Sequence, residues 1–312
     1  MKRFLCRLLI FSFIFSLWGE VIVRVFKLTP EIPSLFIDDS KIQRYIPYQS
    51  GYYTKSKEKW KVNKYGWTGI VDIVSHQSVI SIIGDSFIEN FMNPKECNQA
   101  SFIKKEIENY GFFEAGRSGV NFIEALEISD YLAEFLNIET QLLYLNSNDF
   151  FDSVFEKNNR KYQAMKIDLE TSIVLNSSLK FPLLKKVLYN FKFFYYLYQR
   201  FYSSIDLNTK KKAIKTSQIN QDYSKINKLL KYASKNYNLK NLHLVFHPNT
   251  DPEIIKLSNK HGFKSIQLDS NNTKAWTFEH DNHWSCYGHK EASIQVTNYL
   301  NELLQNKTKS SQ

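Results

Sequence analysis

A serine and a distant aspartate–histidine pair have the surroundings that nucleophilic catalysis requires. Ser86 follows Gly84 and Asp85 directly after a short apolar run. A glycine at that point permits the tight turn that projects a hydroxyl from the tip of a strand. Asp281 and His283 lie two residues apart near the C-terminus. This spacing lets Asp281 hold one ring nitrogen of His283 while the other faces a serine hydroxyl, so these residues are candidates for a Ser-His-Asp triad.

The sequence around these groups alternates between strand-like and helix-like patterns. Short apolar runs end in polar or glycine residues at 79–86, 112–116, 142–149 and 242–248. Apolar residues at helical spacing lie between the first three runs, at 101–110 and 122–136. Such alternation predicts an α/β fold with a parallel sheet. Because ligands of these sheets bind at the carboxyl ends of the strands, we expect the polar residues after the four runs to converge at one edge.

Four blocks in this order resemble those of the SGNH (GDSL-type) hydrolase superfamily. They are Gly84-Asp85-Ser86-Phe87, the stretch 114–119 with Gly116, Asn148-Asp149, and Asp281-x-His283. The resemblance spans about residues 78 to 305, and four ordered blocks are far more specific than any one of them. It implies a flavodoxin-like three-layer α/β/α sandwich around a central parallel sheet.

The resemblance also implies roles for the site residues. His283 takes the proton of Ser86, which attacks an ester carbonyl and forms an acyl-enzyme, while Asp281 orients the imidazole. The oxyanion hole is formed by the N–H groups of Ser86 and Gly116 and the side-chain amide of Asn148. No cofactor and no metal are expected. The expected substrate is an acyl ester, such as an O-acetyl ester, of a carbohydrate or lipid.

The chain departs from the family pattern at three points. Glu114 stands where the second block commonly has asparagine, and Asn146 where the third usually has glycine. The last block is one residue shorter than Asp-x-x-His. The first two departures put the substrate geometry in question, but every group needed for acyl transfer is present.

Other functions are compatible with parts of the pattern. Asp281-x-His283-Trp284 also resembles the final block of polysaccharide O-acetyltransferases, so transfer of the acyl group to a cell-surface polysaccharide is an alternative to hydrolysis. A glycan-binding module of the same fold is the non-enzymatic alternative, and the complete triad argues against it. Trp284 either lines the acyl pocket or packs its loop, and packing is the more common role for an aromatic residue there. His247, at another strand tip, is expected to be structural.

Histidines and cysteines near the C-terminus allow two further interpretations. His280, His283, Cys286 and His289 recur every third residue, as in a zinc site, but Gly288 interrupts the helix and no second ligand cluster appears. Cys97 and Cys286 could form a disulfide in an oxidising compartment or remain separate thiols. The triad interpretation needs neither.

The N-terminus has the features of an export signal. Three of its first seven residues are basic (Lys2, Arg3 and Arg7), and residues 8–19 carry no charge. The apolar stretch reaches 16 residues between Arg7 and Arg24, interrupted by Glu20, whereas a bilayer asks for about 20. Snorkelling of both arginines would lengthen the usable span. With no small-x-small cleavage site, residues 1–27 are expected to be an uncleaved transmembrane anchor, with the catalytic domain extracytoplasmic, in the periplasm or at the cell surface.

The rest of the chain divides by composition. A polar lead-in at 28–77 contains an alternating run from Lys55 to Lys61 that is typical of an exposed edge strand. The hydrolase domain is expected at 78–305, with a helical insertion at about 151–239 and a polar tail at 306–312. Within the insertion, aromatic residues at helical spacing indicate a core-facing stripe, with a substrate groove or membrane contact as alternatives: Phe191, Phe194, Tyr195, Tyr198 and Phe201.

The net charge of +10 does not indicate nucleic-acid binding. The lysines are spread along the chain, and the basic run 210–215 and the tail lack any nucleic-acid-binding motif. Attraction to an anionic membrane or polysaccharide fits this distribution better. With 43% hydrophobic residues and only 10 Gly and 7 Pro in 312, the composition excludes a disordered, collagen-like or coiled-coil chain.

Overall fold

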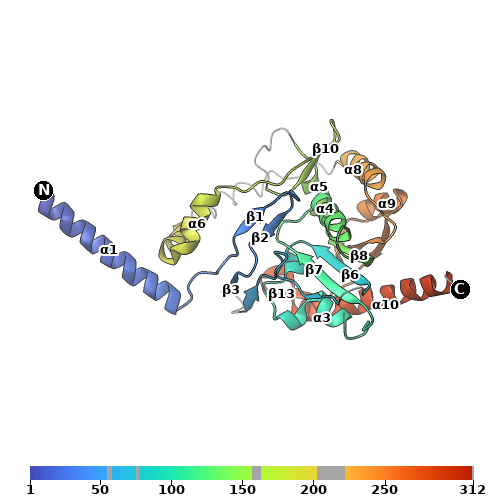
Figure 1. Ribbon diagram of the computed structural model, residues 1–312, viewed down its shortest axis with the longest axis horizontal. Coiled ribbons are helices and arrows are strands. Elements are labelled where there is room, and N and C mark those ends of the chain that lie inside the picture. Colours follow the sequence, from blue (N-terminus) through green and yellow to red (C-terminus); the bar gives the residue numbers. More distant parts are fainter. Residues whose placement is uncertain (55–57, 75–76, 157–162, 202–221, 311–312) are drawn as a thin grey trace.

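A six-stranded sheet forms the centre of the computed structural model, which describes residues 1–54, 58–74, 77–156, 163–201 and 222–310. The strand order is β12-β11-β8-β6-β7-β5 (Figure 1). The strands are β5 (Val71–Asp72), β6 (Val79–Gly84), β7 (Gly111–Gly116), β8 (Ile138–Leu145), β11 (Leu242–Phe246) and β12 (Lys264–Gln267). All neighbours pair in parallel except β5, which runs antiparallel to β7 at the edge.

The order of the five parallel strands identifies the type of α/β fold. Taken in chain order, they lie in the sequence 2-1-3-4-5 across the sheet, which is the flavodoxin-like doubly wound arrangement. The chain reverses its direction of winding at β6, and ligands bind at such a switch point. The predicted fold class is therefore confirmed, with β5 making the sheet mixed rather than wholly parallel.

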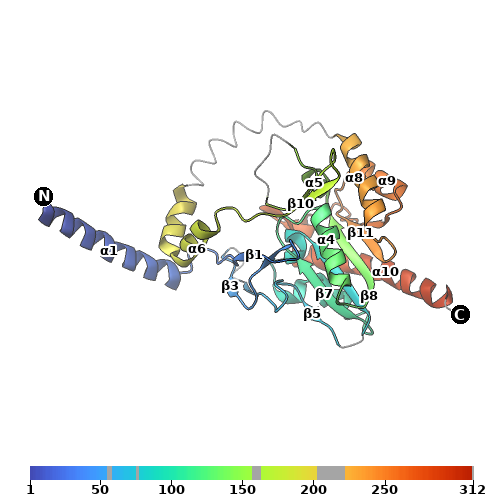
Figure 2. The same ribbon diagram turned by 45° about the horizontal axis from the view of Figure 1, so that its top comes forward.

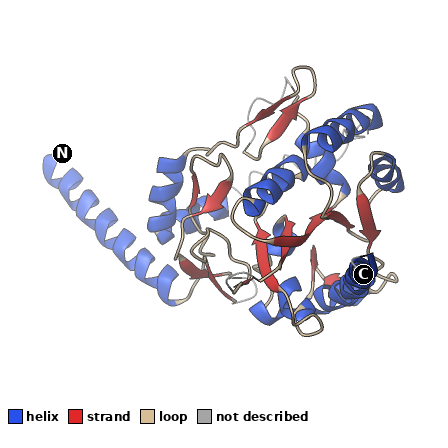
Figure 3. Ribbon diagram, turned by 45° about the vertical axis from the view of Figure 1, so that its right-hand side comes forward, coloured by secondary structure: helices blue, strands red, loops and turns tan. Residues whose placement is uncertain are grey.

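Helices cover both faces of the sheet (Figure 3). Alternate residues of one strand point into different cores, because side chains of a strand alternate between its faces. Ile83 and Leu143 pack with α4 (Phe122–Ala133), α5 (Ser147–Ser153), α8 (Tyr223–Asn236) and α9 (Pro252–Lys260). Ile82 and Leu142 pack on the other face with α3 (Gln99–Ile103) and α10 (Cys286–Ser310). These layers form the expected three-layer sandwich.

The helix expected at 101–110 is shorter than the sequence indicates. After α3 the chain continues in turns with i→i+3 hydrogen bonds, from the N–H of Lys105 to the carbonyl of Phe102 and from Glu106 to Ile103. Ile107 is still buried. The apolar spacing therefore reflects burial in tight turns, because the chain must reverse to enter β7 at Gly111.

The lead-in contains two antiparallel strand pairs. β1 (Leu35–Ile37) pairs with β2 (Gln43–Tyr45), and β3 (Ser50–Tyr52) pairs with β4 (Lys59–Lys61). In β4 the lysines are exposed and Trp60 is buried, as the alternating pattern predicts. Lys55 and Lys57 of that pattern, like the basic run 210–215, lie outside the described residues.

The segment between α5 and α8 contains a hairpin as well as helices. β9 (Lys166–Asp168) pairs with β10 (Ile173–Leu175), and α6 (Pro182–Asn190) and helical residues 192–201 follow. α8 packs fully buried leucines into the main core and so belongs to the central layers. The prediction of a core-facing aromatic stripe is wrong for four of its five residues: only Tyr195 is buried, and Phe191, Phe194, Tyr198 and Phe201 are exposed.

At the N-terminus, α1 (Lys2–Val25) projects away from the body of the protein (Figure 1). Within the part of the chain that the structure describes, it is the one helix long and apolar enough to cross a membrane, with a mean hydropathy of 1.9 over its best 18-residue window. Its side chains are almost all exposed. α1 is therefore a candidate membrane span.

A disulfide joins two segments that are far apart in the sequence. Cys97 of η1 (Lys95–Cys97) is bonded to Cys286 at the start of α10, with a Cα–Cα distance of 5.1 Å. Of the two alternatives open from the sequence, the structure contains the bridge, and Cys6 is the free cysteine.

We expect Cys97→Ser to lower the free energy of unfolding by about 2–5 kcal/mol, because the bridge closes a long loop and limits the unfolded chain. The two cysteines are 189 residues apart. Denaturant unfolding of the full chain in detergent micelles, followed by tryptophan fluorescence, measures the change. Cys6→Ser is the matched control and should leave stability unchanged. Equal stability of Cys97→Ser and the parent would contradict this role.

Candidate active site

Ser86 begins α2 (Ser86–Glu89) at the carboxyl end of β6. Asp85 caps this helix by accepting a 3.0 Å hydrogen bond from the N–H of Phe87. At Gly84 an added Cβ would lie 2.6 Å from Cγ1 of Ile88. A glycine is therefore needed for α2 to fold back against the end of the strand. This turn leaves Ser86 half-buried at the switch point of the sheet.

His283 and Asp281 lie on β14 (Asp281–Trp284), which pairs with β13 (Thr277–Phe278) after the short helix η2 (Lys274–Trp276). Nε2 of His283 lies 2.7 Å from Oγ of Ser86, across 197 residues of chain. Nδ1 lies 2.5 Å from Oδ1 of Asp281, which also accepts the N–H of His283 at 3.1 Å. The three side chains predicted from the sequence thus form one line of hydrogen bonds.

Trp284 fixes the position of β14. It is 2% exposed, and its ring packs against Phe87 at 5.3 Å and His247 at 4.6 Å between ring centroids. Of its two possible roles, the structure therefore shows loop packing. Because side chains alternate along a strand, burying Trp284 turns the neighbouring His283 toward Ser86.

The predicted oxyanion groups lie at the ends of the two strands beside β6. Gly116 ends β7, and a Cβ added there would lie 2.3 Å from the backbone N of Glu89, so its backbone closely approaches α2. Asn148 lies in the first turn of α5, just after β8, with its side chain exposed. Because β7 and β8 are the parallel neighbours of β6, both residues lie at the same end of the sheet as Ser86.

Asn146, which departs from the family pattern in the third block, has a structural role. Its side chain caps α5 by accepting the N–H of Asn148 at 2.9 Å, while its own N–H donates to Asp149 at 2.7 Å. Its amide also donates to Asp85 at 3.4 Å. This capping box connects the third block to the turn that carries Ser86.

Glu114, which departs from the family pattern in the second block, is also structural. It is fully buried, and its carboxylate accepts the N–H groups of Ala100 at 2.9 Å and Ile70 at 3.0 Å, and the amide of Asn98 at 3.1 Å. The residue therefore holds α3 and the lead-in onto β7.

Three buried acidic residues, Asp85, Asp149 and Glu89, lie close to the turn that carries Ser86. Burial raises the pKa of Asp85 to about 6. Burial, and then the negative charge of Asp85, raise the pKa of Asp149 well above its usual range. Burial also raises the pKa of Glu89, whose carboxylate accepts the hydroxyls of Tyr45 and Ser118. The turn around Ser86 is therefore held by carboxyl groups that bind protons more readily than exposed ones.

Two histidines near His283 are held neutral. Burial lowers the pKa of both His247 and His289 to about 3. The ring of His247 packs on Phe87 at 4.4 Å, as expected for a structural residue, and Nδ1 of His289 lies 3.1 Å from the amide of Gln99. With Cys286 in a disulfide, the zinc interpretation loses a ligand, and among the described residues no group of three or more His, Cys, Asp or Glu could hold a metal ion.

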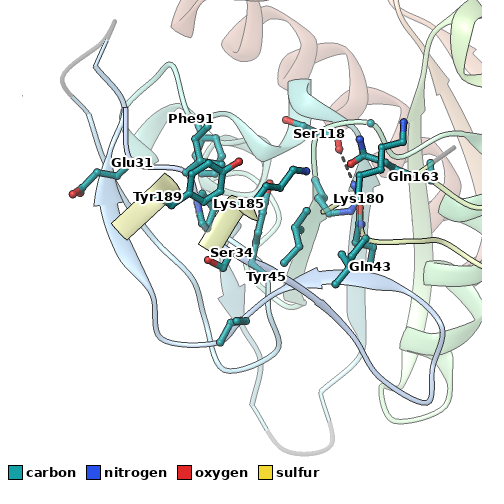
Figure 4. A pocket seen from close by; sticks show the side chains of 18 of the residues that line it. Glu31, Ser34, Gln43, Tyr45, Phe91, Ser118, Gln163, Lys180, Lys185 and Tyr189 are labelled. Carbon is teal, nitrogen blue, oxygen red and sulfur yellow. Dashed lines mark hydrogen bonds between the residues drawn. The ribbon is translucent and has the colours of Figure 1, made fainter. Parts of the chain in front are cut away.

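A pocket of ≈ 1030 Å³ lies between the lead-in, the loop after β7 and the insertion (Figure 4). Its lining includes Tyr45, Tyr53, Phe91, Arg117, Ser118, Lys180, Lys185 and Tyr189, and none of the triad residues is among the described lining residues. Arg117 and Ser118 directly follow Gly116, and Ser118 donates to Glu89 of α2, so this wall of the pocket lies next to the helix that begins at Ser86. Sequence reasoning missed it, since abundant tyrosine was the only signal in the lead-in.

We expect the stability of this protein to fall with rising pH through the titration of Asp85. Its pKa is about 6 in the folded protein against an ordinary value of 3.8, so the folded state holds the extra proton between these values. The contribution is full below the ordinary pKa and is lost as the pH rises through the folded one, by about 3 kcal/mol in all. Asp85→Asn keeps the cap and should remove this loss.

Denaturant unfolding of the full chain at a series of pH values between about 4 and 7 measures the difference. Asp222→Asn is the matched control, because Asp222 caps α8 at an exposed position. The same pH dependence in the parent and in Asp85→Asn would contradict the assignment.

Comparison with known proteins finds similarity only at the level of solved structures. No protein-family model matches the sequence, and no curated protein matches it. One similar structure is a member of the lipolytic protein G-D-S-L family from Veillonella parvula, with 11% identity over 71% of this chain and 97% of that chain and a TM-score of 0.36. Another is the psychrotrophic esterase EstA from Pseudoalteromonas sp., with 12% identity over 73% and 100% and a TM-score of 0.40. These are distant similarities of fold, so the interpretation of the site rests on the geometry described above.

Proposed function

We propose that this chain is a serine esterase of the SGNH (GDSL) type that acts on acyl esters of a carbohydrate or lipid. The observation that carries the proposal is the line of hydrogen bonds from Ser86 through His283 to Asp281, with distances of 2.7 and 2.5 Å. Such a line is the arrangement that activates a serine hydroxyl. The four sequence blocks support the same assignment.

In the proposed reaction, Nε2 of His283 accepts the proton of Ser86 as Oγ attacks the ester carbonyl. Asp281 holds the Nδ1 proton and stabilises the imidazolium that forms. The imidazolium then gives its proton to the leaving alcohol, which leaves an acyl group on Ser86. Water attacks this acyl-enzyme with His283 again as base, and the acid is released as Ser86 recovers its proton.

The negative charge of the tetrahedral intermediate is met at the ends of β6, β7 and β8. The N–H groups of Ser86 and Gly116 and the amide of Asn148 are the proposed donors. A donor in such a site is worth about 3 kcal/mol when it is aimed at the oxygen only in the transition state. The exposed position of Asn148 leaves its amide available to a substrate.

The pocket beside the triad is the proposed binding site for the rest of the substrate. Tyr53, Phe91 and Tyr189 provide aromatic faces, and Lys180 and Lys185 provide positive charge. The guanidinium of Arg117 is paired with the buried Glu124 at 2.6 Å. Aromatic faces pack on the apolar faces of sugar rings as well as on acyl chains. The pocket therefore suits a hydroxylated or anionic substrate much larger than an acetyl group.

We further propose that α1 anchors the enzyme in a membrane with the hydrolase domain on the extracytoplasmic side. The basic residues before the apolar stretch favour a cytoplasmic N-terminus. The disulfide between Cys97 and Cys286 is compatible with an oxidising compartment such as the periplasm or cell surface.

Water is preferred here over a sugar hydroxyl as the acyl acceptor. The resemblance to polysaccharide O-acetyltransferases depends on Trp284 following the triad histidine, and this side chain is buried in the core. The glycan-binding alternative needs no aligned triad, whereas here the hydrogen bonds join segments 197 residues apart.

The triad is tested by labelling the full chain with a fluorophosphonate, which reacts with an activated serine. Ser86→Ala and His283→Ala should abolish labelling and lower ester hydrolysis by about 10⁴-fold or more. Ser285→Ala and His280→Ala are the matched controls in the same region, and both should label as the parent does. Labelling of Ser86→Ala at the parent's rate would refute the assignment of the nucleophile.

The oxyanion role is tested by Asn148→Ala. We expect kcat for a soluble ester to fall by about 10²–10³-fold with little change in KM, because the lost hydrogen bond is made mainly in the transition state. Asn282→Ala, at the exposed position between Asp281 and His283, is the control for loss of an amide near the site. A kcat for Asn148→Ala within a few fold of the control would remove Asn148 from the oxyanion hole.

A further inference from the structure

An apolar surface is exposed on the part of the insertion formed by α6 and the helical residues after it, here called the insertion helices (181–201). Eight large apolar or aromatic side chains on it are between 47% and 80% exposed: Phe181, Leu183, Leu184, Val187, Phe191, Phe194, Tyr198 and Phe201. Contiguous exposure on this scale marks an interaction site in a folded protein. The insertion helices lie beside the C-terminal end of α1 and apart from the sheet (Figures 1 and 2).

Ring packing joins the insertion helices to α1. The ring of Phe193 packs edge-on against Phe15 with centroids 5.6 Å apart. It also covers Gly19, where an added Cβ would lie 2.5 Å from the ring. Glycine at this position therefore allows the two segments to touch.

Polar groups at the end of α1 complete the junction. The carboxylate of Glu20 accepts the N–H groups of Lys192 at 3.1 Å and Phe193 at 2.8 Å, so it caps the helix that begins there. Arg24 donates to the carbonyl of Asn190 at 2.8 Å and pairs with Glu20. The charge of Glu20, which interrupts the apolar stretch, is thus neutralised and hydrogen-bonded within the protein.

This junction fixes the depth of the insertion helices relative to a bilayer. Phe15 precedes Glu20 by five residues, which is about 7 Å along a helix. It belongs to the uncharged stretch that would lie in hydrocarbon. Because Phe193 contacts Phe15, the start of the second insertion helix must lie at the same depth, and its exposed neighbours Phe191 and Phe194 cannot be far from the lipid.

We propose that the insertion helices lie in the extracytoplasmic interface of the bilayer, with their exposed apolar side chains among the lipid acyl chains. Amphipathic helices of this kind bind a lipid surface through their apolar face and through basic residues near the headgroups. Lys185 and Arg200 are basic residues of the insertion helices. The occupant of the surface is lipid because the surface is continuous with α1.

The consequence for the enzyme concerns its substrate. Leu183, Lys185 and Tyr189 of α6 form one wall of the large pocket. If α6 rests on the lipid, the pocket lies at headgroup level, within reach of an ester carried by a lipid or by a glycan held at the membrane. This inference rests on α1 being the membrane anchor of the proposed function.

The test measures the depth of nitroxide labels on the full chain in nanodiscs of phosphatidylethanolamine and phosphatidylglycerol. The native Cys6 reports the position of α1 itself. In a Cys6→Ser background, Leu184→Cys, Val187→Cys and Phe191→Cys report the insertion helices. Ile173→Cys on β10 and Ile294→Cys on α10 are controls at exposed apolar positions of the body. Each label's collision rate with oxygen, which concentrates in lipid, is compared with that of a water-soluble nickel chelate.

We expect oxygen collisions to predominate at Cys6 and at the three insertion positions, and chelate collisions at the two controls. If Cys6 is in lipid but the insertion positions behave like the controls, the proposal is wrong while the anchor stands. Labels shielded from both reagents and broadened by a second label would also overturn it, by identifying a contact between two copies. A Cys6 label that collides mainly with the chelate would show that α1 does not lie in lipid. The proposal depends on that position of α1 and would be overturned.

Fluorophosphonate labelling of the same samples keeps this result separate from the proposed catalysis. The label positions are not in the triad, so each variant should still react at Ser86. A variant that reacts is folded, and its depth measurement is then valid. Loss of reaction in the parent protein would count against the proposed esterase and leave the depth measurement unaffected.

Discussion

The hydrogen bond between Ser86 and His283 is the contact on which the rest of the arrangement depends, because no element of the sheet holds both residues. Ser86 is fixed by β6 and the turn into α2, whereas His283 is carried by the four-residue β14, which pairs with the two-residue β13 outside the central sheet. The position of His283 therefore depends on its neighbours. Trp284 is buried on one side, and two residues further Cys286 is bonded to Cys97. The short strand β14 is thus held in place by the packing of Trp284 and by the disulfide that begins two residues beyond it.

Of the three histidines near this contact, two are kept neutral by burial, and the third contacts Ser86. His247 and His289 are buried with their pKa values lowered to about 3, so they remain neutral beside His283. The carboxylate of Asp281, by contrast, lies 2.5 Å from Nδ1 of His283 and orients that ring toward Ser86. Burial has the opposite effect on the acidic residues Asp85 and Asp149, because it raises their pKa values. Among these three histidines, His283 is therefore the one that contacts Ser86 and is paired with a carboxylate.

The features that depend on short local sequence patterns could be predicted from the sequence. The strand ends at Gly84 and Gly116, and the turn with Asn148 after β8, follow from apolar runs that stop at turn residues. The alternation of strands and helices predicts a parallel sheet, which brings these residues to the same end of the sheet. Longer-range outcomes could not be predicted in this way. Whether Cys97 meets Cys286 depends on how α10 packs on α3. The aromatic spacing at 191–201 gave the helix correctly but the wrong surroundings, because periodicity identifies an apolar face without saying what covers it. The pocket residues Tyr45 and Tyr53 belong to hairpins whose position is set only by tertiary packing.

The two regions without a recognisable motif, the lead-in and the insertion, are the ones that give the site its setting. They come together at the pocket, where Glu31 and Leu35 of the lead-in face Leu183 and Tyr189 of α6. Glu31 follows the end of α1 by only six residues, and α6 is tied to α1 through Arg24 and Asn190. Both walls are therefore tethered to the end of the same helix. On the proposed anchoring of α1, the pocket is held at a fixed distance from the bilayer, because both of its walls are joined to that helix, one by the chain and the other by the hydrogen bond from Arg24 to Asn190. This connection does not depend on the central sheet.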